Sequence, residues 1–168
     1  MKAGELRALQ APLKERYRAE PDAALVTLRA SGRLDGDGLT CKVETGRALV
    51  EASLHSATGG DGLSACSGDM LLEALVACAG VTLRAVATAL EIDLRGGTVS
   101  AEGDLDFRGT LGVSREAPVG FRDIRLRFEL ETAAPADKIE SLIKLTERYC
   151  VVYQSLQAPP KLTLAVRT

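Results

Sequence analysis

Four cysteines are the side chains in this sequence best able to do chemistry, and they stand singly at positions 41, 66, 78 and 150. Cys78 lies inside the apolar stretch "LLEALVACAGVTLRAVATAL", and Cys150 lies downstream in "LTERYCVVYQSL". A thiol attacks as the thiolate, and an unperturbed thiol is only a few per cent ionised at neutral pH. Burial among leucines and valines raises the pKa further, so Cys78 is either a small inert hydrophobe or one half of a redox pair.

The surroundings of Cys150 favour the redox interpretation. It follows a predicted helix, and if a new helical turn begins there, the backbone N–H groups of that turn favour an anionic sulfur. Arg148 is a nearby cation, although an arginine in this position is often simply solvated. The chain ends one turn and begins another around the sulfur, where a cleft could form.

The remaining cysteines and His55, the only histidine, indicate no particular chemistry as clearly. The four cysteines and His55 are numerous enough to bind zinc, but their spacing is not that of a zinc site, so no metal is expected. Cys66 is either an alternative disulfide partner or a buried loop residue. His55 is a base, a substrate contact or a plain hydrogen-bonding residue. Cys41 alternates with Leu39 and Val43 on a predicted strand, which indicates packing.

Composition narrows the protein class. A chain of 168 residues can form one domain with a substantial core. With 21 basic and 23 acidic residues, no general attraction to nucleic acid or an anionic membrane is expected. The charged N-terminus carries no apolar signal segment, which predicts a cytoplasmic protein without a disulfide framework. Residues 71–90 are as long as a membrane span, but Glu73 and Arg84 favour a buried core helix.

The hydrophobic periodicity predicts an α+β domain. We expect a helix over 3–18 interrupted near Pro12, then an antiparallel meander of three strands over 24–34, 39–44 and 47–54. A loop over 55–69 leads into the long helix, with Ser67 or Asp69 as its N-cap and Gly96 or Gly97 as its stop.

The second half predicts a hairpin, a helix and a last strand. Residues 99–107 pair with 121–131, where Ile124, Leu126, Phe128 and Leu130 alternate with charged residues. The 108–120 connection is long for a hairpin loop, and such loops are often functional, but the sequence does not indicate which function this one has. Pro135 opens the second helix, and residues 161–167 form the final strand. One small sheet covers only one side of the apolar long helix, so we predict a homodimer.

Two cysteine motifs together resemble those of the OsmC/Ohr family of thiol-dependent peroxidases. They are "GDMLLEALVACAG" around Cys78 and "ERYCVVYQSL" around Cys150. The family contexts are P-E-E-L-L-x-A-A-L-x-A-C and C-P-V-S-x-S-L. The resemblance covers residues 24–168. It implies an OsmC-like domain there, after an N-terminal helical extension over 1–23, with an antiparallel sheet on a long central apolar helix and an intertwined homodimer.

The resemblance also implies a chemistry. The Cys78 thiolate attacks an organic hydroperoxide, and the sulfenic acid condenses with Cys150 to a disulfide. A dithiol, lipoyl-type or small, restores the pair without any cofactor. By family analogy Arg33, with Arg29 as the alternative, holds the thiolate. The apolar surroundings of the thiol favour bulky alkyl or lipid-type peroxides over hydrogen peroxide.

Two positions depart from the family pattern. Gly68 stands where the family has an acidic residue, so Glu73 or Asp69 is the substitute candidate, and Val151 replaces the usual proline after the second cysteine. Loss of the acidic residue favours an alternative, a non-catalytic dimer of the same fold that binds a small apolar molecule. A redox sensor that forms the same disulfide without turnover is the third interpretation.

Overall fold

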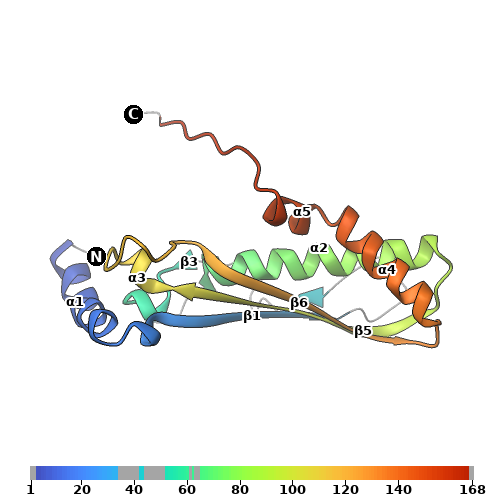
Figure 1. The fold of residues 1–168 in the computed structure, drawn as a ribbon, viewed down its shortest axis with the longest axis horizontal. Helices are drawn as coiled ribbons and strands as arrows, with labels where there is room; N and C mark the ends of the chain where they lie inside the picture. Colours follow the sequence, from blue (N-terminus) through green and yellow to red (C-terminus); the bar gives the residue numbers. More distant parts are fainter. Residues whose placement is uncertain (1–2, 34–41, 44–51, 61, 63–64, 167–168) are drawn as a thin grey trace.

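The computed structural model describes residues 3–33, 42–43, 52–60, 62 and 65–166. Two sheets and several helices make up the fold (Figure 1). The helices are α1 (Ala3–Ala19), η1 (Pro21–Ala24), η2 (Ser56–Thr58), α2 (Ser67–Ala89), α3 (Phe107–Thr110), α4 (Ala136–Tyr149) and α5 (Val151–Gln157). The strands are β1 (Leu25–Arg33), β2 (Lys42–Val43), β3 (Ala52–Ser53), β4 (Ala65–Cys66), β5 (Leu94–Asp106) and β6 (Phe121–Thr132).

The main sheet has the strand order β2-β1-β5-β6, and each neighbouring pair is antiparallel. The β5–β6 pairing confirms the predicted hairpin, and both strands are longer than predicted. The alternation of β6 is also confirmed, because its apolar side chains are half-buried and its charged ones are exposed. On the exposed face Arg125 bonds to Asp104 at 2.6 Å and to Asp123 at 3.1 Å. One face of the sheet is therefore solvated and the other packs on the core.

The long apolar helix α2 lies against the inner face of the sheet, and α4 and α5 pack on α2 (Figure 1). The fully buried side chains of these layers include Leu72, Leu75, Val76, Leu83, Val99 and Leu142. By length and composition alone α2 is apolar enough to cross a membrane. Half of its most apolar window is buried inside the protein, as in the core helices of soluble folds.

The boundaries of α2 differ from the prediction. Its N-cap is Cys66, without a side-chain cap bond, while Ser67 and Asp69 lie inside the first turn. The helix ends at Ala89 rather than at the glycines, because Glu91 adopts φ +54 and turns the chain toward β5. Gly96 and Gly97 belong to β5, where a register shift interrupts the ladder between Leu94 and Gly96.

The N-terminal third also departs from the prediction. Pro12 does not interrupt α1, which runs continuously to Ala19. The first two strands of the predicted meander pair as expected, but β3 pairs in parallel with β4 in a separate sheet. The α1 helix is anchored by Tyr17, which is buried and donates a hydrogen bond to the Ala57 carbonyl at 2.7 Å. Cys41 and most of the predicted strands over 39–44 and 47–54 lie outside the described residues.

The predicted final strand is wrong for the chain as described. Residues 159–166 form neither strand nor helix, and their side chains are exposed. In Figure 1 this segment leaves α5 and runs away from the rest of the molecule. A strand needs a neighbouring strand to satisfy its backbone groups, and no described strand lies beside this segment.

Candidate functional site

The structure brings Cys78 and Cys150 together. Cys78 lies near the middle of α2, and Cys150 is the single residue between α4 and α5. Their side chains form a hydrogen bond with each other, and both thiols are free. Because α4 and α5 both pack against α2, the break between them holds Cys150 over the middle of that helix.

Cys150 both ends α4 and begins α5. Its N–H donates to the Thr146 carbonyl at 2.9 Å, which closes the last turn of α4. Its sulfur then accepts the N–H of Tyr153 at 3.5 Å and acts as the N-cap of α5. The extended backbone of Cys150, φ −73 and ψ 107, produces the change of direction. The predicted new turn therefore exists, with Cys150 as its cap.

The two sulfurs differ in exposure and in acidity. Cys150 is 1% exposed, whereas Cys78 is half-buried. Burial raises the pKa of the Cys150 thiol to about 11, and neighbouring Cys78 contributes to the increase. Burial also acts to raise the pKa of Cys78, but four hydrogen bonds outweigh it and lower that pKa below the ordinary thiol value. The donors are the backbone N–H groups of Val152 and Val151, the Cys150 thiol and the Thr82 hydroxyl. Cys78 is thus the more easily ionised and the more accessible sulfur.

Backbone groups, rather than a described cation, lower the pKa of Cys78. Arg148 is exposed and its guanidinium lies 5.5 Å from the ring centroid of Tyr149, which is the solvated position considered above. Arg29 and Arg33 are the fifth and last residues of β1, and their side chains lie outside the described part of the structure. The cationic partner expected from the family resemblance therefore stays a prediction.

The acidic candidates lie in the first two turns of α2. Burial raises the pKa of Asp69, and His55 acts in the opposite direction. Burial also raises the pKa of Glu73, and Asp69 adds to the effect. Neither carboxyl is among the described groups that shift the pKa of Cys78. A supporting role for Glu73 in the reaction of Cys78 stays a prediction.

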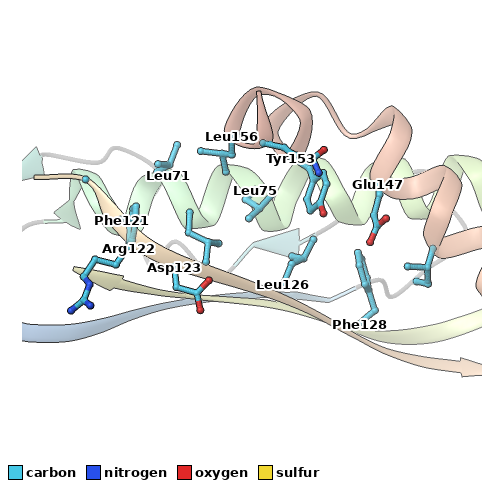
Figure 2. A pocket seen from close by; sticks show the side chains of 14 residues that line it. Leu71, Leu75, Phe121, Arg122, Asp123, Leu126, Phe128, Glu147, Tyr153 and Leu156 are labelled. Carbon is cyan, nitrogen blue, oxygen red and sulfur yellow. The ribbon is translucent and has the colours of Figure 1, made fainter. Parts of the chain in front are cut away.

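A cavity of about 680 Å³ lies between α2, α4, α5 and β6, and neither cysteine is among its lining residues (Figure 2). Leu75, one turn before Cys78, and Tyr153, the N–H donor to Cys150, both line it. Figure 2 shows apolar side chains from α2, α5 and β6 around this space, among them Leu71, Leu75, Tyr153, Leu156, Phe121, Leu126 and Phe128. Its size and lining are typical of a site for a small, largely apolar molecule.

His55 and Cys66 line a separate cavity of about 370 Å³ near the start of α2. The His55 Nδ1 accepts the N–H of Ala57 at 3.0 Å, and the ring stacks on Phe107 with centroids 4.9 Å apart. These contacts support the interpretation of His55 as a hydrogen-bonding residue. Cys66 is half-buried. It precedes Cys78 by twelve residues, about 18 Å along a helix, so the two cannot form a disulfide.

Within the described ranges no group of three or more His, Cys, Asp or Glu is arranged to hold a metal ion. The 108–120 connection begins with α3, capped by the Asp106 carboxylate, which also forms an ion pair with Arg108 at 2.6 Å. Gly109 lies against the backbone of Ala117 and Pro118. The start of the connection is therefore packed, whereas most residues over 115–120 are exposed.

Three donors to Cys78 were absent from the sequence-based hypothesis. Thr82 lies four residues after Cys78, the helical spacing at which side chains meet, and this spacing could have identified it. Val151 and Val152 contribute only their N–H groups, which no side-chain motif reports. Val151 stands where the family pattern has proline, and proline has no N–H to donate. This difference is a partial indication that the N–H of residue 151 has a role.

Comparisons with known proteins agree with this geometry. Residues 59–165 match the OsmC-like protein family. A solved structure of an OsmC-like hydroperoxide resistance protein from Jannaschia sp. CCS1 is similar, with a TM-score of 0.61 and 16% sequence identity. The likeness covers 86% of this chain and 95% of that chain, and at this identity it establishes the fold. No curated protein matches the sequence significantly.

Proposed function

Because this chain belongs to the OsmC-like protein family, we propose that it reduces organic hydroperoxides through a thiol–disulfide cycle of Cys78 and Cys150. The observation that carries the proposal is the hydrogen bond between the two side chains, with the lowered pKa on the more exposed sulfur. A nucleophilic thiol needs both ionisation and access, and Cys78 has a lowered pKa and a side chain that is only half-buried.

The cycle has three balanced steps. The Cys78 thiolate attacks the distal, OH-bearing oxygen of ROOH to form the sulfenic acid, the O–O bond breaks, and the alkoxide takes a proton and leaves as ROH. Cys150 then attacks the Cys78 sulfenic acid, which forms the disulfide and releases water. An external dithiol, lipoyl-type or a small thiol pair, exchanges with the disulfide, is oxidised itself and returns both cysteines to thiols. The family resemblance supplies Arg33 and Glu73 as further candidates in the first step.

The cavity lined by Leu75 and Tyr153 supports an organic rather than an inorganic peroxide. Its lining is mostly leucine, isoleucine and aromatic side chains, which gain from burying an alkyl group and gain nothing from hydrogen peroxide. Its polar members, Arg122, Asp123, Glu147 and Gln157, are too few to bind a highly polar substrate. The substrate class that fits best is an alkyl or aryl hydroperoxide.

We also propose that the working unit is a homodimer. On α2, Leu71 and Val81 are 38% and 41% exposed, and Ala74 and Ala85 are exposed beside them. These residues and Cys78 repeat every three or four positions, so they lie along one stripe of the helix. An apolar stripe this long is typical of an interface between subunits, which would place Cys78 beside the partner. Light scattering on the purified protein tests the mass, and Val81→Asp should give monomers.

All three described cysteines are free, as the cycle requires at rest, and a cytoplasmic location keeps such thiols reduced. Intact-mass spectrometry after one equivalent of cumene hydroperoxide tests the cycle. We expect a loss of two hydrogens in the wild type and in the control Cys66→Ser. We expect a gain of one oxygen in Cys150→Ser. An unchanged wild-type mass, or no turnover with any dithiol, contradicts the proposal.

A second function is favoured by the size of the cavity alone. A non-catalytic dimer could bind a small apolar molecule there, without any change at the sulfurs. That function predicts an unchanged mass with peroxide but saturable binding of an apolar fluorescent probe, which Leu75→Glu abolishes. A redox sensor would form the disulfide but show no steady-state turnover.

A further inference from the structure

Two cavities meet at Phe121, the first residue of β6. The larger one, of about 680 Å³, lies between β6 and the helices α2, α4 and α5, and the smaller one, of about 370 Å³, lies near the start of α2. Leu71, Gly120 and Phe121 line both of them. Since Gly120 has no side chain, the wall between the two spaces is made by the side chains of Leu71 and Phe121.

The Phe121 ring lies in the layer between the sheet and α2. Gly103 is buried on the inner face of β5, where it alternates with Ala101 and Leu105. A Cβ added at Gly103 would overlap the Phe121 ring and would lie 3.3 Å from the Leu72 side chain of α2. The ring therefore occupies the space that a side chain at this glycine would take, and it closes one end of the large cavity. Figure 2 shows Phe121 at that end, with Phe128 toward the other.

The large cavity follows α2 from the level of Cys78 to this wall. Leu75 and Leu71 line it, and they precede Cys78 by three and seven residues, the spacing of one helix face. At about 1.5 Å per residue, Leu71 lies about 10 Å from Cys78 along the helix, and Ser67, which lines the small cavity, lies about 17 Å away. An extended chain advances about 1.2 Å per single bond, so these distances correspond to alkyl tails of about eight and about fourteen carbons.

We propose that Phe121 limits the length of the alkyl hydroperoxide that this protein accepts, by closing the large cavity at the end away from Cys78. The inference rests on the proposed hydroperoxide reduction and adds the residue that selects among organic peroxides. With the reacting oxygen at Cys78, an alkyl tail that passes Leu75 toward Leu71 meets the Phe121 ring after about eight carbons.

The small cavity would accept a longer tail if the ring were absent. Its lining is mostly apolar and includes Leu54, Leu105, Phe107 and Val119. A tail that passed the wall would bury further CH₂ groups there, and each buried CH₂ raises affinity by about fourfold. In the wild type the ring prevents this gain, so affinity should stop rising at about eight carbons.

The binding of primary alcohols, the products of the proposed reaction, tests the partition without requiring turnover. Their dissociation constants are measured by displacement of an apolar fluorescent probe, over a series from about four to about fourteen carbons. In the wild type we expect the dissociation constant to fall about fourfold per CH₂ up to about eight carbons and then to stay level. In Phe121→Ala the fall should continue to about fourteen carbons. The kcat/KM values of the matching hydroperoxides should follow the same two profiles.

Phe128→Ala is the matched control, because it removes the same side chain from the same strand, toward the other end of the same cavity. It should weaken the binding of every alcohol without moving the chain length at which affinity becomes level. Phe121→Leu should give a profile between those of the wild type and Phe121→Ala, and it replaces the alanine variant if that variant does not fold.

Three results would overturn the proposal. They are a wild-type affinity that keeps rising to about fourteen carbons, equal profiles in the wild type and the Phe121 variants, and no binding of any alcohol. A level wild-type profile that Phe121→Ala extends would support the partition even if none of the proteins reduced a peroxide. In that case the thiol chemistry would be refuted and the role of Phe121 in selecting chain length would stand.

Discussion

Replacing Val151 by proline tests whether backbone hydrogen bonds keep Cys78 ionisable. Val151 is the first residue of α5, a position where proline is tolerated, and the extended backbone of Cys150 before it suits a following proline. The substitution therefore removes one N–H donor to Cys78 and leaves the helix intact. A hydrogen bond to a charged group contributes about 1.5–3 kcal/mol, which solvent screening at half-buried Cys78 reduces to roughly 1 kcal/mol. That energy corresponds to about a fivefold smaller thiolate population at neutral pH.

The assay is the rate of iodoacetamide alkylation at Cys78, followed by peptide mass spectrometry from pH 5 to pH 10. We expect Val151→Pro to alkylate about fivefold more slowly at pH 7, with its pH profile displaced upward. Val151→Ala is the matched control, because it shortens the same side chain but keeps the N–H, and its profile should equal that of the wild type. Equal thermal stability of the two variants excludes a folding defect. If Val151→Pro alkylates as fast as Val151→Ala, the N–H of residue 151 does not stabilise the thiolate.

Three further predictions concern stability. Arg125 lowers the pKa of Asp104 to about 2, so this carboxylate stabilises the fold above about pH 4 and the contribution is lost as pH falls toward 2. Asp104→Asn should lower the melting temperature by at most a few degrees at pH 7 and by nothing near pH 2 in calorimetry; an equal decrease at both pH values contradicts the assignment. Leu142 is 0% exposed and lies where α4 packs on α2. Leu142→Ala should therefore lower the free energy of unfolding in urea by about 2–4 kcal/mol. A decrease below about 1 kcal/mol would refute its place in the core. Gly97 has φ +150, and an added Cβ would overlap the carbonyl oxygen of Glu129. Gly112 also has a positive φ, +66, but an added Cβ there has open space. Gly97→Ala should therefore destabilise the protein measurably more than Gly112→Ala.

Local patterns predicted the elements whose neighbours lie close in the sequence. The alternation around Leu126 and Phe128 was sufficient for the β5–β6 hairpin, because period two is a property of the strand itself. Pro135 likewise predicted the start of α4, which begins at the next residue. The end of α2 was missed, because Glu91 adopts a left-handed conformation that non-glycine residues seldom take, and no residue type announces it.

Long-range pairing was harder to predict than the elements. The parallel contact of β3 with β4 joins segments separated by a loop, and neither two-residue strand has a pattern of its own. The two cysteines were identified by their motifs, and their contact follows from the packing of α4 and α5 on α2. The sequence predicted a new turn whose N–H groups favour an anionic sulfur, but not that Val151 and Val152 donate to Cys78, because only the fold selects which backbone groups meet a given sulfur.

The unequal burial of the two sulfurs has a consequence for how electrons enter the protein. If the pair is oxidised, an incoming reductant can reach only the sulfur of Cys78, because Cys150 is enclosed by α4 and α5. The bond then breaks with Cys150 as the departing thiol, and burial, which raises the pKa of this thiol, makes it a slow leaving group. Recovery, rather than attack on peroxide, would then limit the rate, and trapping with a labelled thiol should find the mixed disulfide on residue 78. The peroxide and the reductant would thus react one after the other at the same accessible sulfur, that of Cys78.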